Sequence, residues 1–217
     1  MGRDTKKLHP FVQMLGDALI KECHRQGMNV KITDCVRNKQ EQDACIKAGT
    51  SRVQFPYSYH AWALAFDICQ NDSKCPYPSD NEWWKRVGKI GKKLGLEWGG
   101  YWLGRDIDRP HFQLNSYTGG KNNVVSLIRI YGNPSTFFRH NDFQIITPTK
   151  PITPLSSKKK ILWLQVKLNC QEGGGYGLEL DGVYGAKTTQ AVKDFWKKKT
   201  GKKCTGKLVK KSCIDLL

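Results

Sequence analysis

The feature that most constrains the fold is an apolar run at residues 63–68, which follows one potential metal ligand and contains another. Residues 58–67 read Ser-Tyr-His-Ala-Trp-Ala-Leu-Ala-Phe-Asp, so the two candidates are His60 and Asp67. A short apolar run of this kind predicts a central β-strand. Side chains alternate between the two faces of a strand, so residues seven positions apart cannot share one face. We therefore predict that His60 lies on the loop entering the strand and that Asp67 lies within it.

A second histidine, His111, stands in a segment that reads Asp-Arg-Pro-His-Phe-Gln-Leu over residues 108–114. Two imidazoles and one carboxylate make a complete protein ligand set for a catalytic zinc, because the fourth position stays open for water. Asp108 lies just upstream and is placed to take the proton of that water. Its ordinary pKa of about 3.9 would leave it ionised and ready to accept. Asp106 is the alternative carboxylate for this role.

The remaining hydrophobic pattern predicts a mixture of helices and strands, an α+β arrangement. Helical spacing extends over 9–27, 37–49, 81–95 and 122–131, and further strands are expected over 29–33 and 111–114. Residues 133–160 are rich in Pro, Thr and Ser, which predicts a linker without packed structure. Helices are expected again from residue 161, over 188–199 and at the end of the chain. The predicted organisation is a catalytic domain over 1–132, a linker over 133–160 and a small domain over 161–217.

The chain has a formal net charge of +17 and a pI near 9.6, which predicts an anionic partner. Nucleic acid, an anionic membrane surface and an anionic cell-wall polymer all satisfy this condition. The charge is uneven, because residues 148–217 carry 15 Lys or Arg and 5 Asp or Glu, a net of +10. The C-terminal segment is therefore the more basic part of the chain per residue.

The eight cysteines and the N-terminal sequence bear on the compartment in which the chain folds. No segment has the features of a signal peptide and no run has transmembrane length, so we expect synthesis in the cytoplasm and no stable membrane insertion. Thiols stay reduced there, and most of the cysteines are expected to be small buried residues. Cys69 and Cys75 flank a loop and are the pair expected to bridge if conditions become oxidising.

Residues 1–115 resemble the zinc peptidase family of D-Ala-D-Ala carboxypeptidases and L-alanyl-D-glutamate endopeptidases (VanY-like), whose fold is related to the hedgehog signalling domain. The family motif Ser-x-His-x-x-Gly-x-Ala-x-Asp is matched by Ser58, His60, Ala65 and Asp67, with Ala63 in place of the glycine. Alanine is a mild replacement where φ is negative and a costly one where φ is positive. The resemblance implies an α+β domain with a small central antiparallel sheet.

Two further elements carry the resemblance. The family pattern Arg-x-x-x-x-Gln stands here as Arg37 and Gln42, and the family's acidic residue before the last ligand stands as Asp108. The stretch Trp-Gly-Gly-Tyr-Trp at residues 98–102, followed by Asp-Arg-Pro-His-Phe-Gln, is most similar to the L-alanyl-D-glutamate peptidases of phage endolysins.

The resemblance implies a role for each matched residue. His60, Asp67 and His111 would bind Zn²⁺, although other divalent ions can suit such ligands, and Asp108 would be the general base. Arg37 would stabilise the tetrahedral oxyanion or grip a substrate carboxylate, unless it forms a structural salt bridge. Ser58 would contact the substrate or orient the loop before His60. Trp98, Tyr101 and Trp102 would line the substrate cleft unless they belong to the core. Gln42 is expected to be structural.

Residues 161–217 resemble a small all-α peptidoglycan-binding domain. The matching pattern is Leu-Gln-x-x-Leu-Asn at residues 164–169 and Asp-Gly-x-Tyr-Gly at residues 181–185. A wall peptidase joined to a wall-binding domain resembles a phage endolysin. This implies a zinc-dependent L-alanyl-D-glutamate endopeptidase, expected to be a monomer, with bacterial peptidoglycan as its partner. Such an enzyme collects in the host cytoplasm and reaches the wall after a holin opens the membrane.

Three alternatives remain open from the sequence. The first is a D-Ala-D-Ala carboxypeptidase with the same ligands and chemistry. The second is a basic nucleic-acid-binding protein with a structural zinc, but a set of two histidines and one aspartate differs from a closed structural site, so we expect no nucleic-acid partner. The third is a wall-binding protein whose peptidase half is inactive, because of the departure at Ala63.

Overall fold

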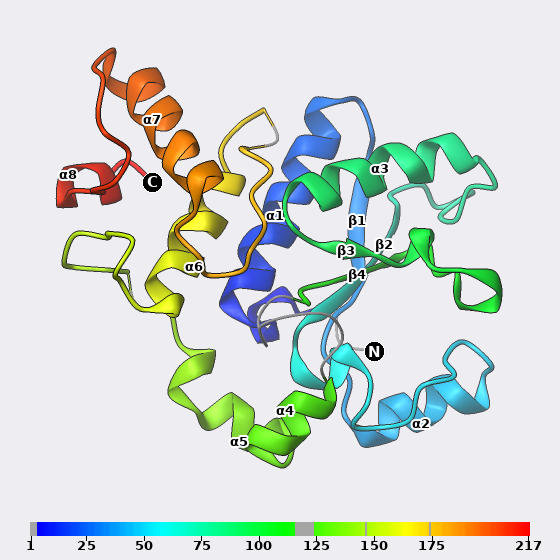
Figure 1. The fold of residues 1–217 in the computed structure, drawn as a ribbon. Coiled ribbons are helices and arrows are strands. Elements are labelled where there is room, and N and C mark those ends of the chain that lie inside the picture. Colours follow the sequence, from blue (N-terminus) through cyan, green and yellow to red (C-terminus); the bar gives the residue numbers. More distant parts are fainter. Residues whose placement is uncertain (1–3, 116–123, 146, 174) are drawn as a thin grey trace.

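A computed structural model of the protein describes residues 4–115, 124–145, 147–173 and 175–217 (Figure 1). It combines helices with a small antiparallel sheet, as the sequence predicted. Within the described ranges, no helix has the length and apolar character needed to cross a membrane. Five of the eight cysteines are buried, as expected for small core residues.

The sheet has four strands in the order β1-β2-β4-β3, and every neighbouring pair is antiparallel. The strands are β1 (Val30–Asp34), β2 (Ala65–Gln70), β3 (Glu97–Trp98) and β4 (His111–Gln113). The apolar run therefore forms an interior strand, as predicted. Phe66 lies opposite Phe112 and Asp67 lies opposite His111. Because side chains alternate along each strand, the sheet has a phenylalanine face and an Asp67–His111 face.

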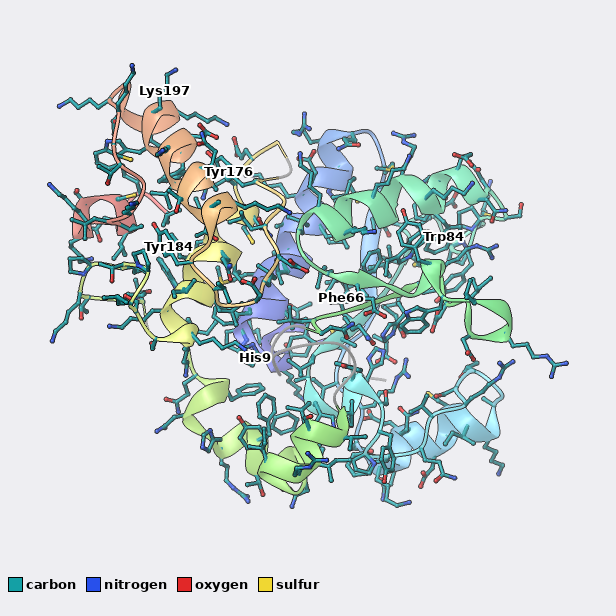
Figure 2. All side chains as sticks on the ribbon, viewed as in Figure 1. His9, Phe66, Trp84, Tyr176, Tyr184 and Lys197 are labelled. Carbon is teal, nitrogen blue, oxygen red and sulfur yellow. The ribbon has the colours of Figure 1, made fainter. Side chains whose placement is uncertain are left out.

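The phenylalanine face is covered by α1 (Pro10–Arg25) and α3 (Asn81–Lys93). Phe66 and Phe112 are completely buried, and their rings stack at 5.8 Å between centroids. Figure 2 shows Phe66 in the middle of the sheet. The absence of a side chain at Gly88 of α3 makes room for Trp98, since a Cβ there would lie 2.1 Å from the indole. The helices thus close one face of the sheet and leave the other for the loops.

The connection between β1 and β2 contains α2 (Lys39–Lys47), which follows β1. This helix begins with a capping box in which Asn38 and Glu41 exchange side-chain and backbone hydrogen bonds. The short 3-10 helix η2 (Tyr59–Trp62) then leads into β2. Together these two elements position the histidine and the arginine of the predicted site.

The segment predicted to be an unpacked linker contributes Phe137 and Ile152 to the core, so the prediction that it lacks packed structure is wrong. The helices after β4 are α4 (Val124–Tyr131), α5 (Pro134–Arg139), α6 (Lys158–Asn169), α7 (Ala186–Thr200) and α8 (Lys211–Ile214). Pro134 begins α5, where its missing N–H has no partner to lose. Phe137 in this helix is completely buried and packs on Trp62 at 5.8 Å. Burial of aromatic side chains therefore gives this segment packed structure despite its proline content.

Several element boundaries also differ from the prediction by a few residues, those of α4 and α6 among them. Helix α4 begins at Val124, and the two residues before it that were expected to be helical lie outside the described residues. Helix α6 begins at Lys158 rather than residue 161, because lysines are good helix formers. The division of the chain into two domains and a linker stays a prediction.

Helix α6 packs on α1, which lies between the sheet and α6, and α7 packs on α6 in turn (Figure 1). Asn169 of α6 donates from Nδ2 to the carbonyls of Leu94 and Leu178, at 3.1 and 2.8 Å. Lys21 of α1 forms an ion pair with Glu172 at 2.6 Å. The hydrogen bond to Leu94 and the Lys21–Glu172 ion pair cross between the predicted catalytic and C-terminal segments, so the two segments share an interface.

Candidate metal centre

The structure brings His60, Asp67 and His111 together on the open face of the sheet. His60 lies in η2, just before β2, as the odd spacing predicted. Asp67 lies within β2 and is the register partner of His111 in β4. All three side chains are buried or nearly so, with exposed fractions of 2%, 16% and 9%. Three segments far apart in the sequence therefore supply one compact cluster.

The distances within the cluster match those of a tetrahedral metal site. His60 Nε2 lies 3.2 Å from His111 Nδ1 and 3.3 Å from Asp67 Oδ1, and His111 Nδ1 lies 3.1 Å from the same oxygen. Zinc bonds of about 2.0–2.1 Å at tetrahedral angles place ligand atoms about 3.3–3.4 Å apart. The three atoms therefore have the spacing that one small ion requires.

The outer nitrogens of both histidines are held by oxygen atoms. His60 Nδ1 lies 2.5 Å from the carbonyl oxygen of Cys35, and His111 Nε2 lies 2.9 Å from Gln113 Oε1. The amide of Gln113 is oriented by its own donation to Asn115 at 2.7 Å. These acceptors assign the protons to the outer nitrogens and leave the inner ones with lone pairs. Three acceptor atoms then face one another, an arrangement that a cation satisfies.

The charges within the cluster also favour a bound cation. Burial raises the pKa of Asp67, but the nearby imidazoles of His60 and His111 outweigh it and hold that pKa well below its usual range. Burial lowers the pKa of His111, and the hydrogen bond and charge of Asp67 reverse the shift, so the net pKa is raised. The carboxylate thus favours positive charge between the three side chains.

Asp108 lies beside this cluster and Asp106 does not. Asp108 is half-buried, and its amide donates to the carbonyl of Gly99 at 3.0 Å. A Cβ on Gly99 would lie 2.5 Å from the Asp108 carbonyl oxygen, so this close approach requires glycine. Asp106 is instead 78% exposed and pairs with Arg52 at 3.7 Å. The structure therefore favours Asp108 over its rival.

The electrostatics of Asp108 differ from the expectation of an ordinary carboxylate. Burial raises the pKa of the Asp108 carboxyl, and the charges of His111 and Asp67 act on it in opposite directions. The backbone carbonyl of Asp108 accepts from the His111 amide at 3.3 Å, so this residue adjoins a metal ligand. A raised pKa also makes the carboxylate a stronger base than an exposed aspartate.

Arg37 contacts the cluster by a hydrogen bond to one of its ligands, Asp67. Its Nη2 donates to Asp67 Oδ2 at 2.7 Å and its Nε donates to Asp34 Oδ2 at 2.5 Å. The side chain is 11% exposed. Of the alternatives left open by the sequence, this geometry favours the salt bridge over a grip on substrate. Asp34 was missed by sequence reasoning, because its place depends on the pairing of β1 with β2.

The remaining predicted residues divide between support and core. Ser58 accepts a hydrogen bond from the His60 amide at 3.3 Å and so orients η2. This contact agrees with one of its two predicted roles, orientation of the loop before His60. Trp98 is 3% exposed on the phenylalanine face, where register with Phe112 places it, so it belongs to the core. Tyr101 is 48% exposed and packs on Trp98 at 4.7 Å.

Two further residues contact the cluster: Trp102, which was expected to line the cleft or to belong to the core, and Gln113, which sequence reasoning did not select. The ring of Trp102 lies 5.2 Å from that of His111, which makes it the aromatic residue beside a ligand. Gln113 follows His111 by two positions on β4 and so shares its face, a signal that alternation supplies. Gln42 is completely buried and donates to Ser51 and Val53, so its side chain ties α2 to the following loop as expected.

Ala63 occupies a conformation that favours glycine. Its φ is +58° and its ψ is 25°, which is left-handed, and it is completely buried between η2 and β2. No other non-glycine residue in the described ranges has a positive φ. The family motif has glycine at this position, and alanine here carries strain of about 1–2 kcal/mol. The three ligand atoms nevertheless meet at the spacing described above, so the departure leaves the cluster intact.

Comparisons with known proteins find similar sequences and one similar structure. A family model described as D-alanyl-D-alanine carboxypeptidase matches residues 52–114. The peptidoglycan L-alanyl-D-glutamate endopeptidase CwlK of Bacillus subtilis (strain 168) is 32% identical over 123 residues, which cover 49% of this chain and 73% of the relative. The L-alanyl-D-glutamate peptidase of Listeria phage A118 is 36% identical over 116 residues, which cover 52% of this chain and 40% of that relative. The L-Ala D-Glu endopeptidase ChiX of Serratia marcescens, known from a crystal structure, is 21% identical in sequence. The structural match covers 51% of this chain and 83% of ChiX, with a TM-score of 0.38.

Proposed function

The chain belongs to the D-alanyl-D-alanine carboxypeptidase family of metallopeptidases, as the sequence predicted, and from this premise we propose that it is a zinc-dependent L-alanyl-D-glutamate endopeptidase. Its substrate would be the stem peptide of peptidoglycan. The observation that carries the proposal is the meeting of His60, Asp67 and His111 with ligand atoms 3.1–3.3 Å apart. The specificity is supported by the names of the two relatives, both L-alanyl-D-glutamate peptidases.

The roles of the residues follow from their positions. His60, Asp67 and His111 would hold the zinc, which lowers the pKa of a bound water to about 7 and polarises a carbonyl. Asp108 would take a proton from the attacking water and pass it to the amine nitrogen that leaves. The carbonyl of Cys35 and the amide of Gln113 would keep the two imidazoles in one tautomer and one orientation.

The C-terminal segment would dock the enzyme on the wall. Residues 197–211 contain eight lysines and no acidic residue, and Figure 2 shows Lys197 near the outer end of α7. We call this stretch the basic segment. A cavity of 390 Å³ is lined by Trp196 of α7 and by Lys203 and Lys210 of the basic segment, among others. An aromatic wall and two cations suit a sugar ring that carries a carboxylate.

A role as a phage endolysin follows from the same proposal. The phage A118 relative supports it, because that protein is an L-alanyl-D-glutamate peptidase from a phage. The enzyme would act on the host wall once a holin has opened the membrane. Peptidoglycan is the expected partner, and the enriched lysines serve docking on an anionic polymer rather than on nucleic acid.

A digest of purified peptidoglycan tests the function, with new amino termini identified by mass spectrometry. Newly exposed D-Glu amino termini are expected. The description of the family favours a second candidate, a D-Ala-D-Ala carboxypeptidase, and that enzyme would release free D-Ala instead. An absence of both products on several wall types would contradict the proposed peptidase and favour a protein that only binds.

A further inference from the structure

The outer support of the metal centre begins with an irregularity in the sheet. Strands β1 and β2 pair regularly up to Ile32 opposite Ile68, and the next pair is Asp34 opposite Asp67. Thr33 is therefore an extra residue in β1, a bulge of the kind that re-aims side chains next to active sites. As a consequence, two carboxylates stand directly opposite each other on neighbouring strands, a pairing that is destabilising without a counter-charge.

Arg37 supplies that counter-charge and bridges the two carboxylates. Its Nε donates to Asp34 Oδ2 at 2.5 Å and its Nη2 donates to Asp67 Oδ2 at 2.7 Å. The three side chains are 5–16% exposed, so the bridge is shielded from water. The second oxygen of Asp34 accepts from the Cys35 amide at 2.9 Å, which fixes Asp34 in turn.

The bridge divides the two oxygens of Asp67 between two tasks. Oδ2 is held by Arg37, and Oδ1 is the atom that faces His60 and His111 at 3.3 and 3.1 Å. The same short segment also touches His60, because the amide of Arg37 donates to the His60 carbonyl at 3.2 Å. Residues 34–37 thus contact two of the three ligands.

Asp34 also preserves the charge of the ligand. An arginine paired with Asp67 alone would neutralise the carboxylate and weaken its attraction for a cation. With Asp34 present, two negative charges and one positive charge leave a net charge of −1, the same as Asp67 by itself. The guanidinium can therefore orient the ligand without removing its negative charge from the site.

We infer that Asp34 and Arg37 are positioning residues, which hold the carboxylate of Asp67 with one oxygen directed at the metal. The inference rests on the proposed function, since it assigns this task toward the zinc of that site. It differs from a catalytic role for Arg37, because an arginine engaged by two buried carboxylates acts through Asp67. The planar fork of arginine is needed to reach both carboxylates, which a lysine cannot do.

The test measures zinc affinity in the absence of any substrate. Metal-free full-length protein is titrated with zinc against a chromophoric chelator, for the wild type and for Asp34→Asn and Arg37→Lys. Both variants are expected to bind zinc about 10–100-fold more weakly, the usual loss when an outer partner of a ligand is removed. Asp43→Asn is the matched control, because it removes one charge from an exposed carboxylate that pairs with Lys39. It should bind zinc like the wild type.

Melting curves of the metal-free variants separate lost folding from lost positioning. A folded Asp34→Asn protein with wild-type zinc affinity would overturn the inference. An Arg37→Lys protein that keeps its zinc affinity but raises KM would overturn it as well, by assigning Arg37 to the substrate. If the wild type binds zinc but cleaves no peptidoglycan, the proposed function fails while the comparison of zinc affinities still decides the role of residues 34–37.

Discussion

The metal centre and the basic segment are built on opposite principles. In the centre, each ligand is fixed by a second contact: Cys35 holds His60, Arg37 holds Asp67 and Gln113 holds His111. In the basic segment the lysines are exposed, and among the described residues only Lys211 has a carboxylate partner, Asp215. Chemistry requires atoms placed to within about 0.5 Å, whereas docking on a charged polymer requires only charge at the surface. Substitutions should therefore act sharply in the centre and gradually in the basic segment.

The largest effect is expected from loss of a ligand. His60→Ala should abolish both zinc binding and wall digestion, because two ligands leave the cluster open to water. His24→Ala is the control, since His24 contacts the Val30 carbonyl at the far end of β1. Digestion is followed by release of soluble wall fragments. Substantial wall digestion by His60→Ala would contradict the contrast between the two regions, because the metal centre would then tolerate loss of a ligand as the basic segment tolerates loss of a lysine.

The next effect should come from the general base. Asp108→Asn should reduce the digestion rate by about 10²–10⁴-fold, the usual contribution of such a group. Zinc affinity should change little, because Asp108 is not a ligand. Asp106→Asn, on the exposed side of the same loop, should retain full activity. Equal losses for the two variants would show that the structure separates these carboxylates wrongly.

Strain at Ala63 provides a test of how finely the centre is set. Ala63→Val should destabilise the fold by at least about 2 kcal/mol, because a β-branched residue suits neither a positive φ nor the packed site. Ala63→Gly relieves the strain but adds chain entropy and loses a methyl, so it should stay within about 1 kcal/mol of the wild type. Thermal unfolding measures both. A stable Ala63→Val protein would contradict the left-handed conformation.

The basic segment should show the smallest effect per residue. Lys203→Glu combined with Lys210→Glu should weaken adsorption to purified walls by about 0.5–1 kcal/mol per lysine, and more at low salt than at high salt. Hydrolysis of a short soluble stem peptide should be unchanged, since docking does not contribute to it. Sedimentation with walls measures the first quantity. An equal loss on both substrates would show that the basic segment belongs to the catalytic machinery.

The sequence was most informative where one local pattern determines one element. Periodicity identified the helix that became α1 and the strand β2, and spacing alone placed His60 outside that strand. Residues whose role depends on pairing between strands could not be found in this way. Asp34 faces Asp67 only because of an extra residue in β1, and Trp98 faces α3 only because β3 pairs with β4.

The segment after β4 illustrates a second limit. Its prolines and its serine and threonine content predicted a linker, but Phe137 becomes buried on Trp62 through contacts between residues far apart in the sequence. Local composition carries no information about such distant partners. The sequence offered Trp102 as a cleft or core residue, but its contact with His111 depends on a turn rather than on a periodic element.

The most direct test of the central claim is a zinc titration of chelator-stripped protein, with bound metal and wall digestion measured on the same samples. Activity is predicted to disappear on stripping and to return in proportion to bound zinc, reaching its maximum at one ion per chain. Digestion that persists in the stripped protein would contradict a catalytic zinc held by His60, Asp67 and His111. So would a return of activity that does not follow the bound zinc.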